Sequence, residues 1–140
     1  MRTATASTAD VRSAAAVATN GGFHHLLVCL DRSETAEAVL PLASCLARVD
    51  GARLTLLHVL EVMGDEGRAT DALEWDVVRE EARSYLERLA ERMRELGIET
   101  DGRVAEGPAP RSVAALAAEI HADLLVLSTY GVGGRLLGSP

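Results

Sequence analysis

The sequence predicts an α/β domain built around a doubly wound parallel sheet. Short apolar segments without polar alternation, which suit strands buried on both faces, alternate with segments of helical periodicity in the order β-α-β-α-β-α-β. The last apolar segment, residues 124–127, leads directly into a glycine-rich stretch. In such sheets, ligands bind beyond the carboxyl ends of the strands, where the strand order reverses. We therefore expect a ligand site close to the end of the chain.

Composition narrows the range of possible ligands and partners. The chain has 140 residues, enough for one domain with a substantial core, and a formal net charge of -7. This charge argues against nucleic acids and anionic membrane surfaces as partners, and one Phe, one Trp and two Tyr offer little for stacking bases. No apolar stretch approaches the ~20 residues that span a bilayer. The two isolated cysteines, Cys29 and Cys45, are interpreted as core residues in a reducing compartment, so a cytoplasmic location without a metal site is expected.

The first half of the domain follows a flexible N-terminal tail, predicted over residues 1–22; the domain itself is predicted over residues 23–140. Its first strand begins at His24 or His25. Residues 31–34 turn the chain, and Ser33 is a good N-cap for the next helix. Pro41 lies inside that helix and should kink it. Gly51 ends the helix, and residues 52–60 form the second strand.

The second half begins with a charged, glycine-containing connection over residues 61–72 and continues with a long amphipathic helix that ends before Gly97. Residues 98–107 are partly polar, which predicts a strand at the edge of the sheet. Pro110 starts the next helix, and Asp123 leads into the fourth strand. The apolar stripe expected for the long helix consists of Leu73, Val77 or Val78, Ala82, Tyr85, Leu86, Leu89, Met93 and Leu96.

Two segments at the predicted ligand edge carry suitable chemistry. Asp31 follows the first strand, where it is either a nucleotide-binding acid or a turn residue. After the fourth strand, Gly131, Gly133 and Gly134 let main-chain N–H groups approach a phosphate closely, or else they form a loop without that function. Arg135 is either a phosphate ligand or a solvated arginine.

These segments resemble the universal stress protein (UspA) family from about His25 to Ser139. The resemblance rests on LLVCLDRSETAEAVLPLA, GARLTLLHVLE, VAEGPAPRSVAALAAEIHADLLVLSTYG and LLGS, in this order. It implies a flavodoxin-like three-layer sandwich with strand order 3-2-1-4-5. For this chain it implies the order 3-2-1-4, with the fifth strand absent or supplied otherwise.

One branch of the family binds ATP through a pattern of glycine, two residues, glycine, nine residues, then glycine with Ser or Thr. Here the first position is Ser128, a departure from glycine, and the second is Gly131. The final pair is Gly138 and Ser139, with six residues instead of nine after the second glycine. The resemblance also implies that Asp31 meets the adenosine and that Val59 lines the adenine pocket.

The resemblance thus implies a regulatory adenine-nucleotide site, with ATP and Mg²⁺ as the expected ligands. The alternative is a dimeric interaction module of the same family that binds no nucleotide. The sequence contains no Walker motif, Ser-His-Asp, Cys-His or paired-carboxylate arrangement, so no catalytic residue is predicted and slow ATP hydrolysis is the most that is expected.

The fourth strand should have an exposed edge, because no residues follow Pro140 to form the family's last helix and fifth strand. An apolar edge with unpaired main-chain groups is prone to pair with other chains. We expect this edge to be covered by another copy of the chain, by a rearranged terminus or by a partner. A homodimer or other oligomer is expected on the same grounds.

Overall fold

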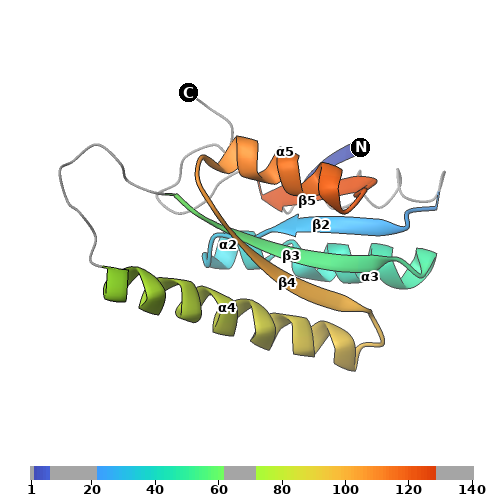
Figure 1. Ribbon diagram of the computed structural model, residues 1–140. Helices are drawn as coiled ribbons and strands as arrows, with labels where there is room; N and C mark the ends of the chain where they lie inside the picture. The colour runs from blue at the N-terminus through green and yellow to red at the C-terminus, as the bar shows by residue number, and fades with distance from the viewer. Residues whose placement is uncertain (1, 7–21, 62–71, 129–140) are drawn as a thin grey trace.

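The computed structural model describes residues 2–6, 22–61 and 72–128 (Figure 1). Within them, the strands are β1 (Arg2–Ala6), β2 (His25–Cys29), β3 (Arg53–Leu60), β4 (Thr100–Glu106) and β5 (Leu124–Ser128). The helices are α2 (Glu34–Glu37), α3 (Leu40–Asp50), α4 (Ala72–Glu95) and α5 (Ala109–Glu119). All strand pairs are parallel, and the sheet order is β1-β5-β2-β3-β4.

The four predicted strands, numbered 1 to 4 in chain order, are β2, β3, β4 and β5. Their order in the sheet is β4-β3-β2-β5, which is the predicted order 3-2-1-4. Helices cover both faces: α3 and α4 lie on one side, and α5 lies on the other (Figure 1). The α/β sandwich expected from the sequence is therefore confirmed. Among the described helices, none combines the length and the apolar composition needed to cross a bilayer.

The N-terminal strand β1 was not predicted. It pairs with β5 along its whole length, from Arg2 opposite Leu124 to Ala6 opposite Ser128. The prediction of a flexible tail was wrong for residues 2–6, while residues 7–21 lie outside the described part. Of the three covers expected for the β5 edge, the chain's own terminus is the one observed. A fifth parallel strand is thus supplied from the start of the chain.

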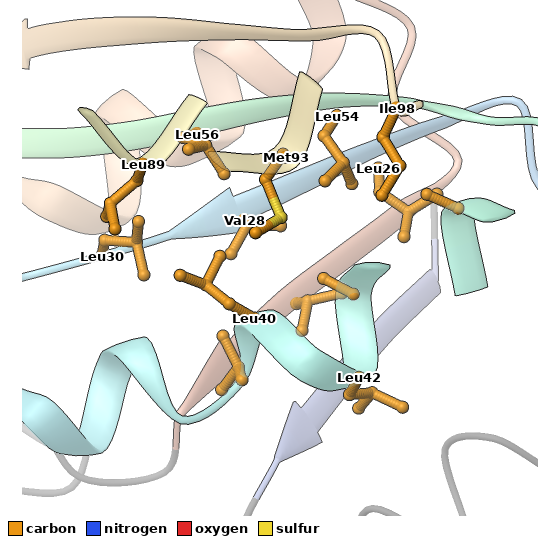
Figure 2. Close-up of a cluster of buried hydrophobic side chains, with 14 of the residues drawn as sticks. Leu26, Val28, Leu30, Leu40, Leu42, Leu54, Leu56, Leu89, Met93 and Ile98 are labelled. Carbon is orange, nitrogen blue, oxygen red and sulfur yellow. The ribbon is translucent and has the colours of Figure 1, made fainter. Parts of the chain in front are cut away.

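Two apolar clusters hold the layers together, one on each face of the sheet. In the larger cluster, Leu26 and Val28 of β2 meet Leu40 of α3 and Met93 of α4 (Figure 2). The smaller cluster joins Leu27, Leu57 and Leu125 of the sheet to Leu116 and Ala117 of α5, together with Ala122. Alternate residues of β2 therefore point into different cores, as strands buried on both faces require.

Pro41 divides the first helical segment more sharply than predicted. Instead of one kinked helix there are two, because α2 ends at Glu37 and α3 begins at Leu40 with Pro41 in its first turn. Proline is well tolerated there, since the first N–H groups of a helix have no partner within it. Gly51 ends α3 in a left-handed conformation, as expected.

The long helix α4 packs through only part of its predicted stripe. Its residues from Ala82 to Met93 that face the sheet are buried, whereas Leu73 is 72% exposed and Val77 is 56% exposed. Leu96, beyond the end of the helix, is exposed too. The prediction that Leu73 and Leu96 belong to the core was wrong, and of the alternatives Val77 and Val78 it is Val78 that is partly buried.

A polar chain of contacts crosses three strands. The Thr55 hydroxyl of β3 donates a hydrogen bond to Asp101 Oδ1 of β4 at 2.8 Å. The hydroxyl oxygen of Thr55 also lies 2.7 Å from His25 Nε2 of β2. Because the hydroxyl proton points to Asp101, Nε2 must carry a proton and donate to Thr55. Thr55 is fully buried, so these contacts satisfy a polar group within the sheet.

Substituting Gly102→Ala tests the contact between β4 and α4. A Cβ atom at this position would lie 2.9 Å from Leu86 Cβ, so helix or strand must shift. We expect a loss of about 1–3 kcal/mol in the free energy of unfolding, the usual cost of overpacking. Alanine elsewhere in a strand would instead stabilise by about 0.5–1 kcal/mol relative to glycine. Urea unfolding shows whether the variant has a lower or a higher free energy of unfolding than the parent. A more stable variant would contradict the close packing.

The pH dependence of stability tests the surroundings of His25. Burial lowers its pKa from the ordinary value of 6.5, Arg53 lowers it further, and Asp101 and Asp123 oppose the change. The unfolded chain therefore binds this proton more readily than the folded one, and stability should fall as the pH drops below about 6.5. Urea unfolding between about pH 5 and 7 should show a smaller slope for His25→Gln than for the parent. Equal slopes would contradict this assignment.

Candidate functional site

The carboxyl ends of β2, β3 and β5 form the edge where the ligand site was predicted. β5 and β2 are adjacent and parallel, so their carboxyl ends lie at the same edge of the sheet. The strand order reverses here, because β3 and β4 lie on one side of β2 while β5 lies on the other. The structure therefore has its topological switch point where the sequence predicted it.

Asp31 is anchored in the turn between β2 and α2. Its Oδ1 accepts hydrogen bonds from the Ser33 amide at 3.0 Å and from the Ser33 hydroxyl at 2.5 Å. The same hydroxyl accepts a hydrogen bond from the Ala36 amide at 3.0 Å and caps α2. Asp31 thus has the turn role considered as one alternative. Its role as a nucleotide ligand stays a prediction, with a carboxylate whose orientation is already fixed.

Arg32 is a part of this edge that sequence reasoning did not identify. Its backbone is left-handed, with φ of 70°, an uncommon conformation for a residue with a side chain. Its guanidinium carbon lies 5.5 Å from the centre of the Tyr85 ring on α4. This cation–π contact attaches the loop after β2 to the long helix.

Tyr85 and His58 form the floor beneath this loop. Their rings meet edge to face, with centroids 6.4 Å apart, and both residues are buried. His58 Nδ1 lies 2.7 Å from the Leu30 carbonyl oxygen, to which only a protonated nitrogen can donate. Burial raises the pKa of the Tyr85 phenol, and the nearby Glu37 carboxylate raises it further. His58 is therefore a packed and hydrogen-bonded imidazole.

The other predicted site residues divide into two groups. Val59 lies in β3, partly buried against the smaller core, and Ser128 is the last residue of β5 with only 1% of its surface exposed. Ser128 was expected to begin the loop, but it still belongs to the strand. The remaining residues lie outside the described part of the chain: Gly131, Gly133, Gly134, Arg135, Gly138 and Ser139.

Two cavities formed by the described residues lie away from the candidate site. A cavity of about 390 Å³ lies between α4 and β4, and one of about 420 Å³ lies where α3 and α4 end; neither is lined by Asp31 or Val59. No three His, Cys, Asp or Glu side chains within residues 22–61 and 72–128 are placed to hold a metal ion. Cys29 is partly buried against the smaller core, and this burial raises its pKa to about 12. Cys45 is exposed, so interpreting it as a core residue was wrong.

This architecture defines the class of protein as a flavodoxin-like α/β sandwich whose candidate site lies at the switch point of its sheet. The model of the universal stress protein family matches residues 22–140, and the chain therefore belongs to this family. The resemblance found in the sequence motifs is thus confirmed. No curated protein sequence gives a match.

Solved structures agree with this assignment. A universal stress family protein from Burkholderia pseudomallei is 30% identical, with a TM-score of 0.65 over 74% of this chain and 80% of that one. UspA from Lactobacillus plantarum is 20% identical, with a TM-score of 0.66 over 81% and 82%. A universal stress protein in complex with cAMP is 24% identical, with a TM-score of 0.63 over 85% and 87%. The last two similarities concern the fold alone.

Substituting Ser33→Ala tests the turn that holds Asp31. The change removes the cap of α2 and both hydrogen bonds between Ser33 Oγ and its neighbours. We expect the free energy of unfolding to fall by about 1 kcal/mol, as is typical for N-caps. Ser33→Thr keeps the hydroxyl and should retain most of that stability. Urea unfolding of both variants measures this difference. If Ser33→Ala is as stable as Ser33→Thr, the hydroxyl does not act as a cap.

Proposed function

We propose that the chain binds an adenine nucleotide as a regulatory ligand. The observation that carries this proposal is that Asp31 follows β2 at the edge where the neighbouring strand β5 also ends. This edge is the switch point of a universal stress fold. It is further supported by a relative that was solved in complex with cAMP. A carboxylate with a fixed orientation suits the sugar of a nucleotide, and a glycine-rich sequence after the neighbouring strand suits its phosphates.

Each part of the nucleotide has an assigned partner in this proposal. Asp31 binds the adenosine hydroxyls, and Val59 contributes to the adenine pocket. The segment after Ser128 binds the phosphates through its glycines, with Arg135 and Ser139 as further ligands. Mg²⁺ would be held mainly through the phosphates, as is common for this ion. A triphosphate depends on the glycine segment more than cAMP does, because cAMP carries a single phosphate.

The proposal assigns regulation rather than turnover. His58 is the imidazole nearest to the site among the described residues, and it is buried with Nδ1 bonded to a carbonyl oxygen. Asp31 accepts two hydrogen bonds at one oxygen, which hold that oxygen in the turn. Neither group is suited to activate a water molecule, so at most slow ATP hydrolysis is expected. A cytoplasmic location is part of the same proposal and agrees with the free thiols.

The second candidate is a dimeric interaction module that binds no nucleotide. It is supported by the exposed pair Leu73 and Val77, which lie one turn apart at the start of α4 and offer an apolar surface. Since β1 occupies the edge of β5, a dimer of this chain would have to use another surface. The same surface serves a nucleotide-regulated dimer, so nucleotide binding separates the two candidates.

Calorimetric titration with ATP and with cAMP, both with Mg²⁺ present, tests the proposal. Asp31→Asn is the informative variant, because its amide oxygen can still accept the hydrogen bonds from Ser33 while the charge is lost. We expect an affinity loss of about tenfold or more, since hydrogen bonds to charged groups contribute about 1.5–3 kcal/mol. Glu91→Gln, an exposed change on α4, is the matched control and should bind as the parent does.

The outcomes separate the candidates. If the folded parent binds neither nucleotide, the nucleotide proposal fails and the interaction module is favoured. If cAMP binds and ATP does not, the adenosine half of the site is supported and the triphosphate half is rejected. If Asp31→Asn binds as tightly as Glu91→Gln, Asp31 has only its role in the turn.

A further inference from the structure

The turn that carries Asp31 is attached to β3 through the residue that precedes it. The Leu30 amide donates a hydrogen bond to the Leu57 carbonyl oxygen at 2.8 Å. The Leu30 carbonyl oxygen accepts a hydrogen bond from His58 Nδ1 at 2.7 Å, and the Leu30 side chain belongs to the larger core (Figure 2). Because β2 itself ends at Cys29, these two bonds extend its attachment to β3 by one residue.

The residue that follows Asp31 is attached to α4 instead. The guanidinium carbon of Arg32 lies 5.5 Å from the centre of the Tyr85 ring. Arg32 has a φ of 70°, a left-handed conformation that a residue with a side chain keeps only where the surrounding contacts hold it. Tyr85 is buried, whereas Arg32 lies at the surface. The ring therefore gives this charged residue of the turn a fixed point of contact.

The two anchors contact each other. The rings of His58 and Tyr85 lie edge to face, with centroids 6.4 Å apart and an angle of 68° between their planes. Both residues are buried. We call His58 and Tyr85 the ring pair. One of its members belongs to the sheet and the other to the long helix, so the turn is held from two layers of the sandwich.

The ring pair does what the Ser33 cap cannot do. The hydrogen bonds between Ser33 and Asp31 join residues two positions apart, so they orient the carboxylate within the turn but move with the turn. The hydrogen bond from His58 instead joins the turn to β3. The next residue of β3 is Val59, which is predicted to line the adenine pocket. The position of Asp31 relative to Val59 therefore depends on the ring pair.

We propose that His58 and Tyr85 are positioning residues, which place Asp31 against the adenosine of the ligand. The identity of the ligand rests on the proposed function; the claim that the ring pair holds the turn does not. Without the pair, the turn would populate further conformations. A ligand that needs one of them then binds more weakly, in proportion to the population of that conformation. Neither residue has to touch the ligand for this effect.

Substitutions on both sides of the contact between Arg32 and Tyr85 test the proposal. Tyr85→Leu removes the ring and keeps an apolar side chain, while Tyr85→Phe keeps the ring. Arg32→Gln removes the charge at an exposed position, where folding is not at risk, and Arg32→Lys keeps the charge. Met93→Ala, a buried change about two turns further along α4, is the control for a general loss of stability.

Hydrogen exchange of the free protein and titration with ATP and with cAMP are the two readouts. We expect Tyr85→Leu and Arg32→Gln to increase exchange at the Leu30 and Ser33 amides. Both variants should lose about 2- to 10-fold in affinity for the nucleotides, as expected for one weak contact. The double variant should lose no more than the larger single loss, because both changes remove the same contact. Tyr85→Phe, Arg32→Lys and Met93→Ala should bind as the parent does.

His58→Phe tests the other member of the ring pair. This change keeps an aromatic ring beside Tyr85 and removes the N–H group that donates to the Leu30 carbonyl oxygen. We expect faster exchange at the Leu30 amide and a loss of affinity of about 2- to 10-fold, the range that corresponds to one hydrogen bond. If His58→Phe binds as the parent does, His58 has no positioning role.

The remaining outcomes that would overturn the proposal differ from failure of the proposed function. Unchanged exchange at the Leu30 and Ser33 amides in Tyr85→Leu would show that the ring pair does not hold the turn. Losses that add up in the double variant would show that Arg32 acts independently of Tyr85. An equal loss of affinity in Met93→Ala would attribute the effect to stability alone. If the parent binds neither nucleotide, the proposed function fails, and hydrogen exchange still decides whether the ring pair holds the turn.

Discussion

Pairing of β5 on both of its edges is the interaction on which the rest of the structure depends. This strand contributes Leu124 and Val126 to the larger core and Leu125 to the smaller one, so both layers of helices pack against it. A strand so apolar cannot leave an edge open to water without a risk of pairing with other chains. β2 closes one edge and β1 closes the other. The candidate ligand site begins where this doubly paired strand ends.

Most of the fold could be predicted because its signals are local. Buried strands show as apolar runs, and Ser33 and Gly51 mark a helix start and a helix end as expected. β1 has no such signal, since RTATA is short and mostly small or polar, and only its distant partner makes it a strand. The exposed start of α4 has a geometric reason. A helix of 24 residues is about 36 Å long, whereas the seven residues of β4 span about 23 Å.

The candidate site shows the same division between local and distant information. Asp31 could be placed because it follows an apolar strand at a switch point, and the family resemblance added its role. Arg32 and Tyr85 could not, since their contact joins residues far apart in sequence. Nor does the sequence reveal that Arg32 adopts a left-handed backbone, a conformation uncommon for residues other than glycine.

The two sides of the candidate site are held by different kinds of interaction. On the β2 side, the Ser33 cap and the contact of Arg32 with Tyr85 fix the loop through side chains that lie inside the family domain. On the β5 side, pairing with β1 involves the main chain of a segment outside that domain. Main-chain pairing does not depend on particular side chains, whereas the Ser33 cap and the contact of Arg32 with Tyr85 do. The β2 side should therefore respond to changes of side chain, and the β5 side to changes that remove a main-chain N–H group from β1.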